Sequence, residues 1–395
     1  MANLFDLNQP VVLDLGSGLT KGGFAGSPEP VAIIGTLVGR PKHPQYAAEP
    51  AKARRVAVGE ALRTLAGVVR ISSPLERGAV ASWPDAEAVW RHMLQDLLRL
   101  GHGEHPMLVT ENALNPRANR ERMAEFFFES AHAPSLCLAV PPVLALYASG
   151  RTTGLVLDVG DTVATALPIA EGHCDAHAIR RIDMGGRDVT DRLITLMRKS
   201  GNPLFASSSE RQAARRIKER HAFVAVKPSE EEHQFAAGRK EMTEFDLPDG
   251  NVVRIGAERF RAAEILFQPE IVSCEFGGVQ DCLQTAVEAG DLEIRRRLYG
   301  SILLAGGTTK LPGFGLRLLE EMKVLAPRDS KVRIHAPPDR LQSAYTGGTI
   351  LASLSTTFRS MAVTRAEYFE HGAAIMHRKT LNWKQETCCR GGSPQ

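Results

Sequence analysis

The chain has 395 residues, which is more than one compact core usually holds, so two or more lobes are expected. Its 48 Lys and Arg residues nearly balance 45 Asp and Glu residues, which leaves a formal net charge of +3. This balance removes the electrostatic case for nucleic acid or an anionic membrane surface as the main partner. Hydrophobic residues make up 43% of the chain, as in ordinary globular proteins, and no apolar run is long enough for a membrane-spanning helix.

Two distant segments share one pattern, VVLDLGSGLTKGGF at 11–24 and GLVLDVGDTVATALP at 154–168. In each, a run of β-branched residues and leucine is followed by Asp-x-Gly, a polar tight turn and a second apolar stretch. This pattern predicts a buried strand, a turn and a second strand that pairs with the first. Two copies predict a duplicated lobe with a site between the copies.

Other elements follow from periodicity and from helix-start signals. Helices are predicted at 84–100, where an apolar stripe has helical period, after Asn115 with Pro116 in the first helical position, and at 209–220 as a mostly solvated helix. A buried strand is predicted at 301–304. The polar stretches 40–55 and 227–241 are predicted as surface loops and 382–395 as an unpacked tail. The alternation of strands and helices favours an α/β protein.

The turn DLGSGLTK has the composition of a phosphate-binding loop. Asp14 ends a strand, and Gly16 and Gly18 allow successive backbone N–H groups to point into one concavity. Such concavities bind phosphate, and Ser17 and Lys21 would add a hydroxyl group and a positive charge. Taken alone, a turn of this kind is as often structural as functional.

The later glycine-bearing corners make the pattern more specific. Asp158, Gly160 and Asp161 form a second Asp-x-Gly turn, and two such turns could hold a Mg²⁺–phosphate group between them. The remaining two corners are LLAGGTTKLPGF at 303–314 and MGGRDVTDRL at 184–193, each with a glycine pair near a helix start.

From about residue 9 to residue 379 the chain resembles the actin family. The most specific matching segments are LYASGRTTG at 146–154, AGGTTKLPGF at 305–314 and GGTILASLST at 347–356. The resemblance implies an α/β actin-like ATPase fold, with duplicated mixed-sheet domains around a nucleotide cleft. The implied subdomains are 1–35 with 73–149 and 342–395, then 36–72, then 150–184 with 274–341, and finally 185–273.

The resemblance also implies a site for ATP or ADP with Mg²⁺. Carried over position by position, the cofactor-binding residues would be Asp14, Gly16, Ser17, Gly18, Leu19 and Lys21 in the first loop, Asp158, Gly160, Asp161 and Val163 in the second, and Gly186, Arg215, Lys218, Glu219, Gly306, Gly307 and Thr308 at the nucleoside end. Asp14 and Asp158 would hold the metal through water.

The sequence departs from the family where ATP is cleaved. Pro141 stands where the family has a glutamine that positions the attacking water, and Thr165 stands where it has a histidine that assists that water. Val159 and Thr162 replace a serine and a glycine of the second loop. Because proline has neither a side-chain hydrogen-bonding group nor an N–H, no catalytic residue is assigned, and we expect hydrolysis to be very slow or absent.

Shorter motifs resemble the centractin branch of the family, which forms the dynactin filament. They include NQPVVLD at 8–14, GFGLRLLEEMKVLAP at 313–327, and Leu341 in place of a lysine of conventional actin. This branch implies self-assembly into a short filament in the cytoplasm and cytoskeleton. Its implied partners are dynactin subunits, filament-capping proteins, dynein and cargo adaptors, without nucleic acid or membrane insertion.

Two other functions stay open at this point. One is a dynamic filament ATPase like conventional actin, and the other is a nuclear actin-related subunit of a chromatin-remodelling complex. The segment LFQP at 266–269 is similarly open, because Phe267 is either the start of the family's hydrophobic plug or a side chain that faces the core.

Overall fold

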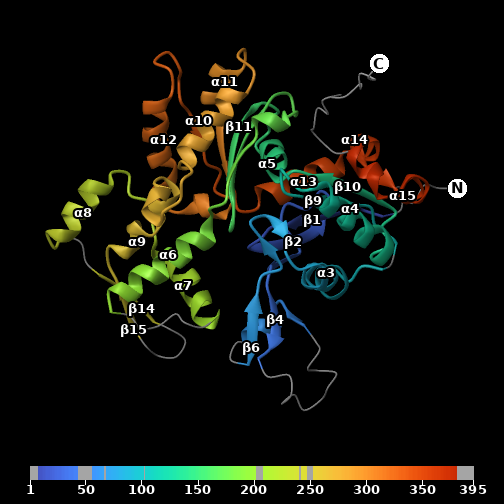
Figure 1. Cartoon of the computed structure of the whole chain (residues 1–395). Helices are drawn as coiled ribbons and strands as arrows, with labels where there is room; N and C mark the ends of the chain where they lie inside the picture. Colours follow the sequence, from blue (N-terminus) through green and yellow to red (C-terminus); the bar gives the residue numbers. More distant parts are fainter. Residues whose placement is uncertain are drawn as a thin grey trace, which may run out of the picture.

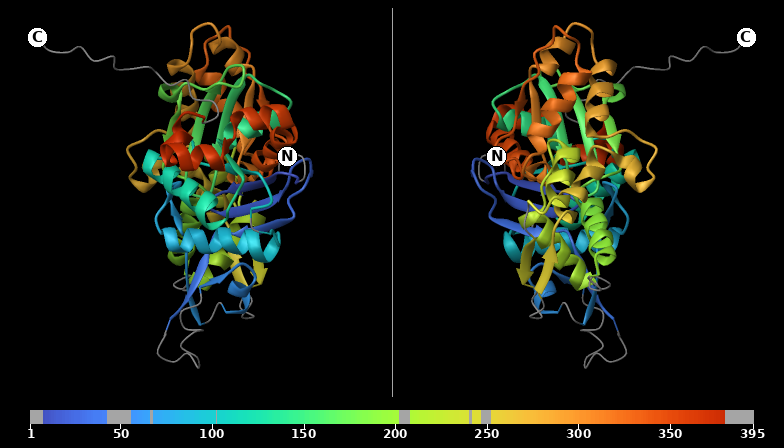
Figure 2. Two further views of the ribbon diagram at one scale, coloured as in Figure 1. Left: turned by 90° about the vertical axis from the view of Figure 1, so that its right-hand side faces the viewer. Right: turned by 90° about the vertical axis from the view of Figure 1, so that its left-hand side faces the viewer.

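The computed structural model describes residues 8–42, 56–65, 68–101, 103–201, 208–239, 242–246 and 252–379. Two mixed β-sheets form the centre of the molecule, and helices pack around them (Figure 1). The views turned by 90° show a narrower body, so the molecule is flattened (Figure 2). The α/β prediction is confirmed.

The first sheet is built around the strand that ends near Asp14. Strand β1 (Val11–Leu15) pairs antiparallel with β2 (Leu19–Phe24) and parallel with β9 (Met107–Thr110). The six strands lie in the order β18-β10-β9-β1-β2-β3, with β18 at Val363–Thr364, β10 at Ser135–Ala139 and β3 at Ala32–Gly35. The predicted strand-turn-strand at 11–24 is therefore confirmed.

The second sheet repeats this arrangement around Asp158. Strand β11 (Gly154–Val159) pairs antiparallel with β12 (Ala164–Ile169) and parallel with β16 (Ile302–Ala305). The five strands lie in the order β13-β12-β11-β16-β17, with β13 at Arg180–Ile182 and β17 at Ile334–His335. The repeat in the sequence thus corresponds to a repeat in topology, and the strand predicted at 301–304 is β16, shifted by one residue.

Three smaller sheets lie outside the two central ones in the described part of the chain. They are β5-β4-β6, with β4 at Val38–Pro41, β5 at Ala57–Val58 and β6 at Val69–Ser72; β7 (Leu75–Glu76) with β8 (Ala79–Val80); and β14 (Thr243–Asp246) with β15 (Val252–Ile255). Strands β4 and β6 project from the first sheet, and β6 contacts helix α7 from the other half of the molecule (Figure 1).

The principal helices fill both halves. They are α3 (Trp83–Arg91) continued by the π-helical turn η3 (His92–Leu97), α4 (Arg117–Glu125), η4 (Phe126–Ser130), α5 (Pro141–Ala148), α6 (Gly186–Lys199), α7 (Ser208–His221), α8 (Pro228–Ala236), α9 (Glu258–Arg261), α10 (Val279–Ala289), α11 (Arg295–Tyr299), α12 (Phe314–Leu325), α13 (Ser343–Ser353), α14 (Ser355–Met361) and α15 (Arg365–His371). No helix in the described ranges is long and apolar enough to cross a membrane.

Each half has its own aromatic core. In the first, the ring of Trp90 stacks on that of Phe127, with centroids 5.7 Å apart. In the second, Phe267 is 2% exposed and packs against Phe314 at 5.3 Å, below the guanidinium of Arg317. Of the two alternatives left open for Phe267, the structure shows a side chain that faces the core.

The two halves meet where α13 packs along α5. A Cβ atom on Gly347 would lie 1.8 Å from the carbonyl oxygen of Leu144, and one on Gly348 would lie 2.9 Å from Val12. Only glycine permits so close a crossing, which gives a physical reason for the glycine pair of GGTILASLST. Since α5 also contacts β11 and α13 contacts β1, this helix pair lies between the two central sheets.

Three predictions of local structure need correction. The stretch 227–241 is not a loop throughout, because α8 occupies Pro228–Ala236, with proline at its start and Glu230 and Glu231 in its first turn. These start signals outweigh the polar composition, and no side chain of α8 is buried, so it is a solvated helix. Helix α4 begins after Pro116, which is itself the N-cap residue, one position later than predicted.

The third correction concerns α7, for which the sequence predicts a mostly solvated helix. One of its faces is buried against the second core through Ala214 and Ile217, and Lys218 is also buried. The helix at 84–100 is confirmed as α3 with η3. Most of the predicted surface loop, residues 43–55, and the predicted tail at 382–395 lie outside the described residues, whereas Arg40 and Pro41 belong to β4.

Candidate functional site

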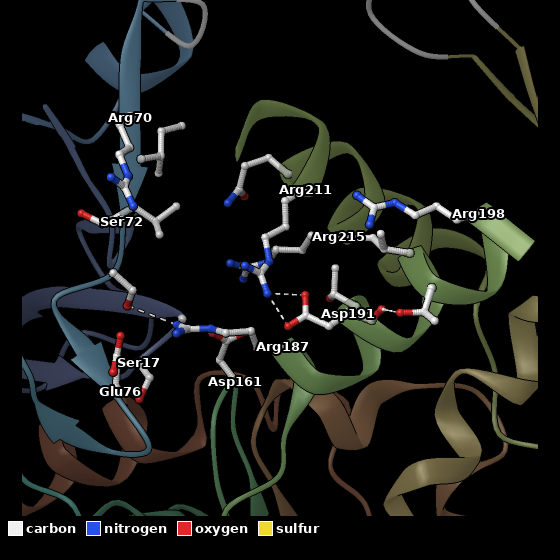
Figure 3. A pocket seen from close by; sticks show the side chains of 18 residues that line it. Ser17, Arg70, Ser72, Glu76, Asp161, Arg187, Asp191, Arg198, Arg211 and Arg215 are labelled. Atoms are coloured by element: carbon white, nitrogen blue, oxygen red, sulfur yellow. Dashed lines mark hydrogen bonds and ion pairs between the residues drawn. The ribbon is translucent and has the colours of Figure 1, made fainter. Parts of the chain in front are cut away.

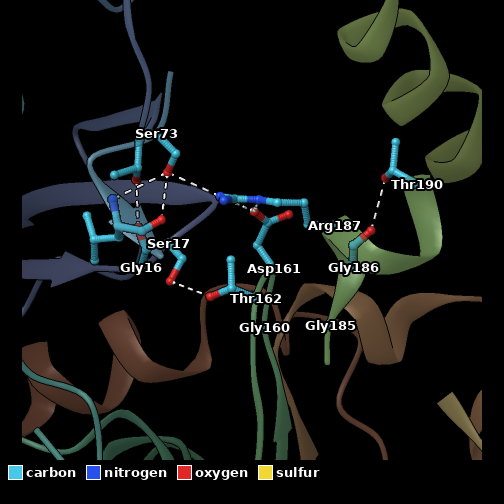
Figure 4. A network of polar contacts seen from close by, with 12 residues as sticks. Gly16, Ser17, Ser73, Gly160, Asp161, Thr162, Gly185, Gly186, Arg187 and Thr190 are labelled. Carbon is cyan, nitrogen blue, oxygen red and sulfur yellow. Dashed lines mark hydrogen bonds and ion pairs between the residues drawn. The ribbon is translucent and has the colours of Figure 1, made fainter. Parts of the chain in front are cut away.

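The two Asp-x-Gly turns face each other across a cleft between the central sheets (Figure 4). The hydroxyl group of Thr162 donates a hydrogen bond to that of Ser17, with 3.0 Å between the oxygens. A Cβ atom on Gly18 would lie 2.8 Å from the Cβ of Asp161, so only glycine allows the turns to approach this closely. The two copies of the motif are therefore in direct contact at one cleft.

A cavity of about 480 Å³ opens beside these turns. All of the predicted cofactor-binding residues line it except Val163 and Gly186. Val163 borders an adjoining cavity of about 110 Å³, which extends from the cleft toward the first core. Gly186 lies at the edge, where its carbonyl oxygen accepts a hydrogen bond of 2.6 Å from Lys218 Nζ.

Two carboxylates lie close together at the end of the cavity nearest the sheets. Asp14 is buried and forms a 2.5 Å ion pair with Lys21, and it accepts a hydrogen bond of 3.1 Å from Thr110. Asp158 is partly buried, and this burial, together with the negative charge of Asp14, raises its pKa to about 6 although Lys21 opposes the shift. A divalent cation would relieve this unfavourable pairing of negative charges.

The carboxylate pair cannot complete a metal site by itself. No group of three or more His, Cys, Asp or Glu side chains gathers at one point in the described part of the chain. Mg²⁺ is commonly held by one or two carboxylates together with water and substrate phosphates. Asp14 and Asp158 therefore fit a metal that arrives with phosphate groups.

The other end of the cavity carries positive charge. Burial, together with the positive charge of Arg215, lowers the pKa of Lys218 to about 8, although Asp161 opposes the shift. Thr308 donates a hydrogen bond of 2.7 Å from its hydroxyl group to the carbonyl oxygen of Gly160, which ties the glycine-rich segment after β16 to the second turn. Buried cations and backbone turns of this kind suit an anionic ligand.

Glycine is required in the floor of the cavity at position 306. Its φ angle is +82°, and a Cβ atom there would lie 2.3 Å from the carbonyl oxygen of Val159 and 2.4 Å from Oδ1 of Asp158. A side chain at this position would both strain the backbone and collide with the carboxylate. Together with the two cations, the carboxylate pair and the hydroxyl of Ser17, this open floor fits a phosphate-bearing ligand with Mg²⁺.

Known proteins match this chain in sequence. The actin family matches residues 5–381. An "Actin-like protein" of Neurospora crassa is 45% identical over 375 residues, which cover 94% of this chain and 98% of that protein. The chain belongs to the actin family. Members of the family generally bind a nucleotide with a divalent metal, and actin-like proteins generally self-assemble or form complexes.

Pro141 and Thr165, two of the four residues predicted to depart from the actin-family pattern, lie at the carboxylate end of the cleft. Pro141 is the first residue of α5 and lines both the cavity of about 480 Å³ and the smaller one. Thr165 stands opposite Asp158 in the register of β11 and β12, is 4% exposed and lines the smaller cavity. Both residues therefore border the smaller cavity beside the two Asp-x-Gly turns.

Some residues of the cleft were missed from the sequence. These additional lining residues are Ala305, Lys310, Leu311, Arg340, Leu341, Ser343 and Ala344. Leu311 and Leu341 add apolar surface to the cavity. In the sequence Leu341 differs from conventional actin, and its place just before α13 is a signal for the cleft. The others come from segments that are distant in sequence and meet only through folding.

Another cavity, of about 680 Å³, lies farther out in the cleft (Figure 3). It is bordered by β6 on one side and by α6 and α7 on the other, and its arginines are Arg70, Arg187, Arg198, Arg211 and Arg215. Much of this charge is compensated, because Arg187 pairs with Asp161 at 2.9 Å and Arg211 pairs with Asp191. Sequence analysis missed this cavity, although the run ERQAARR at 210–216 was a signal.

Proposed function

We propose that this member of the actin family is a nucleotide-binding filament subunit that hydrolyses ATP very slowly or not at all. The observation that carries this proposal is the position of Pro141 and Thr165. Both border the carboxylate end of a cleft whose other features fit a nucleotide. The ligand would be ATP or ADP with Mg²⁺.

The chemistry at these two positions supports slow hydrolysis. A general base or a water-positioning group typically contributes a factor of about 10²–10⁴ in rate. Pro141 has no N–H and no polar side-chain atom, and the hydroxyl group of Thr165 is a poor base at neutral pH. Water could enter the smaller cavity, but neither residue supplies the group that would orient and deprotonate it.

The remaining residues of the site would then bind without cleaving. Asp14 and Asp158 would hold Mg²⁺ through water, and the metal would neutralise the phosphate charge. Lys21 and the backbone of residues 16–18 would contact phosphate, while Lys218, Glu219, Gly306 and Gly307 would face the nucleoside. A nucleotide held in this way stabilises the closed molecule by mass action.

Turnover of bound ATP tests the hydrolytic part of the proposal. The purified full chain is mixed with γ-labelled ATP and Mg²⁺, and both bound nucleotide and released phosphate are followed. We expect binding with very slow release, and at least about a hundredfold faster release in the double variant P141Q/T165H. The variant T349V, which changes a buried threonine on α13, serves as the control. Rapid phosphate release by the wild-type chain would instead favour a dynamic actin-like ATPase.

The cellular role is proposed from the centractin-like motifs. The chain would assemble into the short filament of dynactin in the cytoplasm and help couple dynein to cargo, with its four subdomains bounded as the resemblance implies. Purification of a tagged copy from its native cells tests this role. Recovery of dynactin subunits, capping proteins and dynein supports it, whereas recovery of chromatin-remodelling subunits contradicts it.

A further inference from the structure

A direct hydrogen bond joins the two phosphate loops. Thr162 on the second loop donates to Ser17 on the first, although the residues are 145 positions apart. Thr162 is 2% exposed, so water does not readily compete for this bond. The threonine stands where the family has a glycine, and a glycine could not form this contact.

An arginine from the first half makes hydrogen bonds to the second loop and to residues near it. Arg77, at the tip of the β7–β8 hairpin, donates to the carbonyl oxygen of Thr162 at 3.4 Å, to the carbonyl oxygen of Asp183, and to Oδ2 of Asp188 at 3.0 Å. Arg181 returns a hydrogen bond to the carbonyl oxygen of Arg77. The backbone of Thr162 is therefore fixed while its hydroxyl group faces Ser17.

A second arginine forms an ion pair with the same loop. Arg187 of α6 donates to Oδ2 of Asp161 at 2.9 Å and to the hydroxyl group of Ser73 at 3.1 Å (Figure 4). Asp161 immediately precedes Thr162, and Ser73 belongs to the same half as Ser17. Both braces thus keep the second loop against the first.

The position of the joined hydroxyl groups matters for the length of the ligand. The cavity runs from Glu219, Gly307 and Leu341 at the nucleoside end to the two loops. Each further phosphate on a nucleotide reaches closer to the loops. Ser17 lines this cavity and Thr162 is buried behind it, so a third phosphate that takes up the Ser17 hydroxyl group would separate the two oxygens, which lie 3.0 Å apart, whereas a shorter chain can leave them joined.

We propose that Thr162, through its hydrogen bond to Ser17, makes this cleft select a nucleoside diphosphate over the corresponding triphosphate. This inference rests on the proposed nucleotide-binding function and adds a specificity-determining residue to it. Because one buried neutral hydrogen bond must be opened, the preference contributed by Thr162 is about threefold to tenfold.

Binding constants for Mg·ADP and Mg·ATP test this inference. They are measured by calorimetry on the full chain after removal of bound nucleotide. We expect the wild type to bind Mg·ADP more tightly. The variant T162A should shift the ratio of the two constants toward Mg·ATP by about threefold to tenfold, whereas T162S keeps the hydroxyl group and should retain the wild-type ratio. The control T349V removes a buried hydroxyl that bonds only within α13, and should leave both constants unchanged.

The possible failures are distinguishable. A T162A ratio equal to that of the wild type overturns the inference and leaves the proposed nucleotide binding intact. The inference is also overturned if T162A weakens the binding of both nucleotides equally, because that result indicates a merely structural role. If the wild type binds neither nucleotide, the proposed function and this inference both fail.

Discussion

Asp158 offers the sharpest test of the electrostatics of the cleft. Its pKa is raised from 3.8 to about 6 by burial and by Asp14, so its charged form opposes folding when no cation is present. We predict that D158N stabilises the nucleotide-free protein at neutral pH. The same substitution removes a carboxylate that the bound metal would use, so stability and ligand binding should change in opposite directions.

The size of the expected stabilisation follows from the linkage between protonation and folding. A pKa difference of about two units at 1.36 kcal/mol per unit corresponds to about 3 kcal/mol as an upper limit. The folded state binds the proton more tightly than the unfolded state, so this group contributes stability below about pH 4 that is lost as the pH rises through about 6. At pH 7.5 the whole penalty is present, and the asparagine variant removes it.

Thermal and urea unfolding of the nucleotide-free chain measure this effect. An unfolding entropy of about 2.1 cal/mol/K per residue gives about 0.8 kcal/mol/K for the whole chain, so about 3 kcal/mol raises Tm by about 3–4 °C. The advantage of the variant should shrink between pH 6 and pH 4 and reverse when Mg·ADP is added. The exposed carboxylate of Asp246 on β14 provides the control variant, D246N.

Two results would refute this reasoning. One is a D158N protein that is no more stable than the wild type at pH 7.5 in the absence of nucleotide. The other is a stability advantage that is the same at pH 4.5 and pH 7.5, since that would show that ionisation of Asp158 is not its cause.

Three further predictions concern other parts of the cleft. G306A should lower the free energy of unfolding by more than about 2 kcal/mol, because the added methyl group would meet Val159 and Asp158 in a left-handed backbone. Urea denaturation measures this loss, and an unchanged midpoint of unfolding would contradict the described floor of the cavity. The side chain of Arg77 is half exposed, so R77A should cost no more than about 1 kcal/mol, yet it should speed release of a fluorescent nucleotide in stopped flow; unaltered release argues against its bracing role. The pKa of Lys218 is lowered from 10.5 to about 8, so between these pH values the unfolded state binds more protons than the folded state. The free energy of unfolding should therefore rise by about 2 kcal/mol between pH 7.5 and 9.5. Urea titrations of K218M should lack this rise.

The parts of the fold that the sequence predicts well are those with local causes. A run of β-branched residues before Asp-x-Gly dictates a strand and a turn, and both hairpins occur as predicted. The failures also have local causes. At 227–241 polar composition was given more weight than the helix-start signals of Pro228, Glu230 and Glu231, and the burial of one face of α7 depends on packing against the second core.

The features of the site also fall into two groups, those that a local pattern predicts and those that it does not. Glycine and aspartate positions could be predicted because the turn geometry itself demands them, as at Gly18 and Gly306. The hydrogen bond between Ser17 and Thr162 and the reach of Arg77 to Asp188 depend on how the two halves are placed, which no local pattern specifies. The sequence therefore indicated which residues differ from the family but not what Thr162 contacts.

The cleft of this actin-family chain is proposed to hold one nucleotide with Mg²⁺. The most direct measurement is the nucleotide extracted from the protein purified in Mg²⁺ without added ligand, quantified per chain by chromatography. The account predicts about one adenine nucleotide per chain, released by a metal chelator. A chain that carries no nucleotide, and that binds neither Mg·ADP nor Mg·ATP when each is added back, would contradict it.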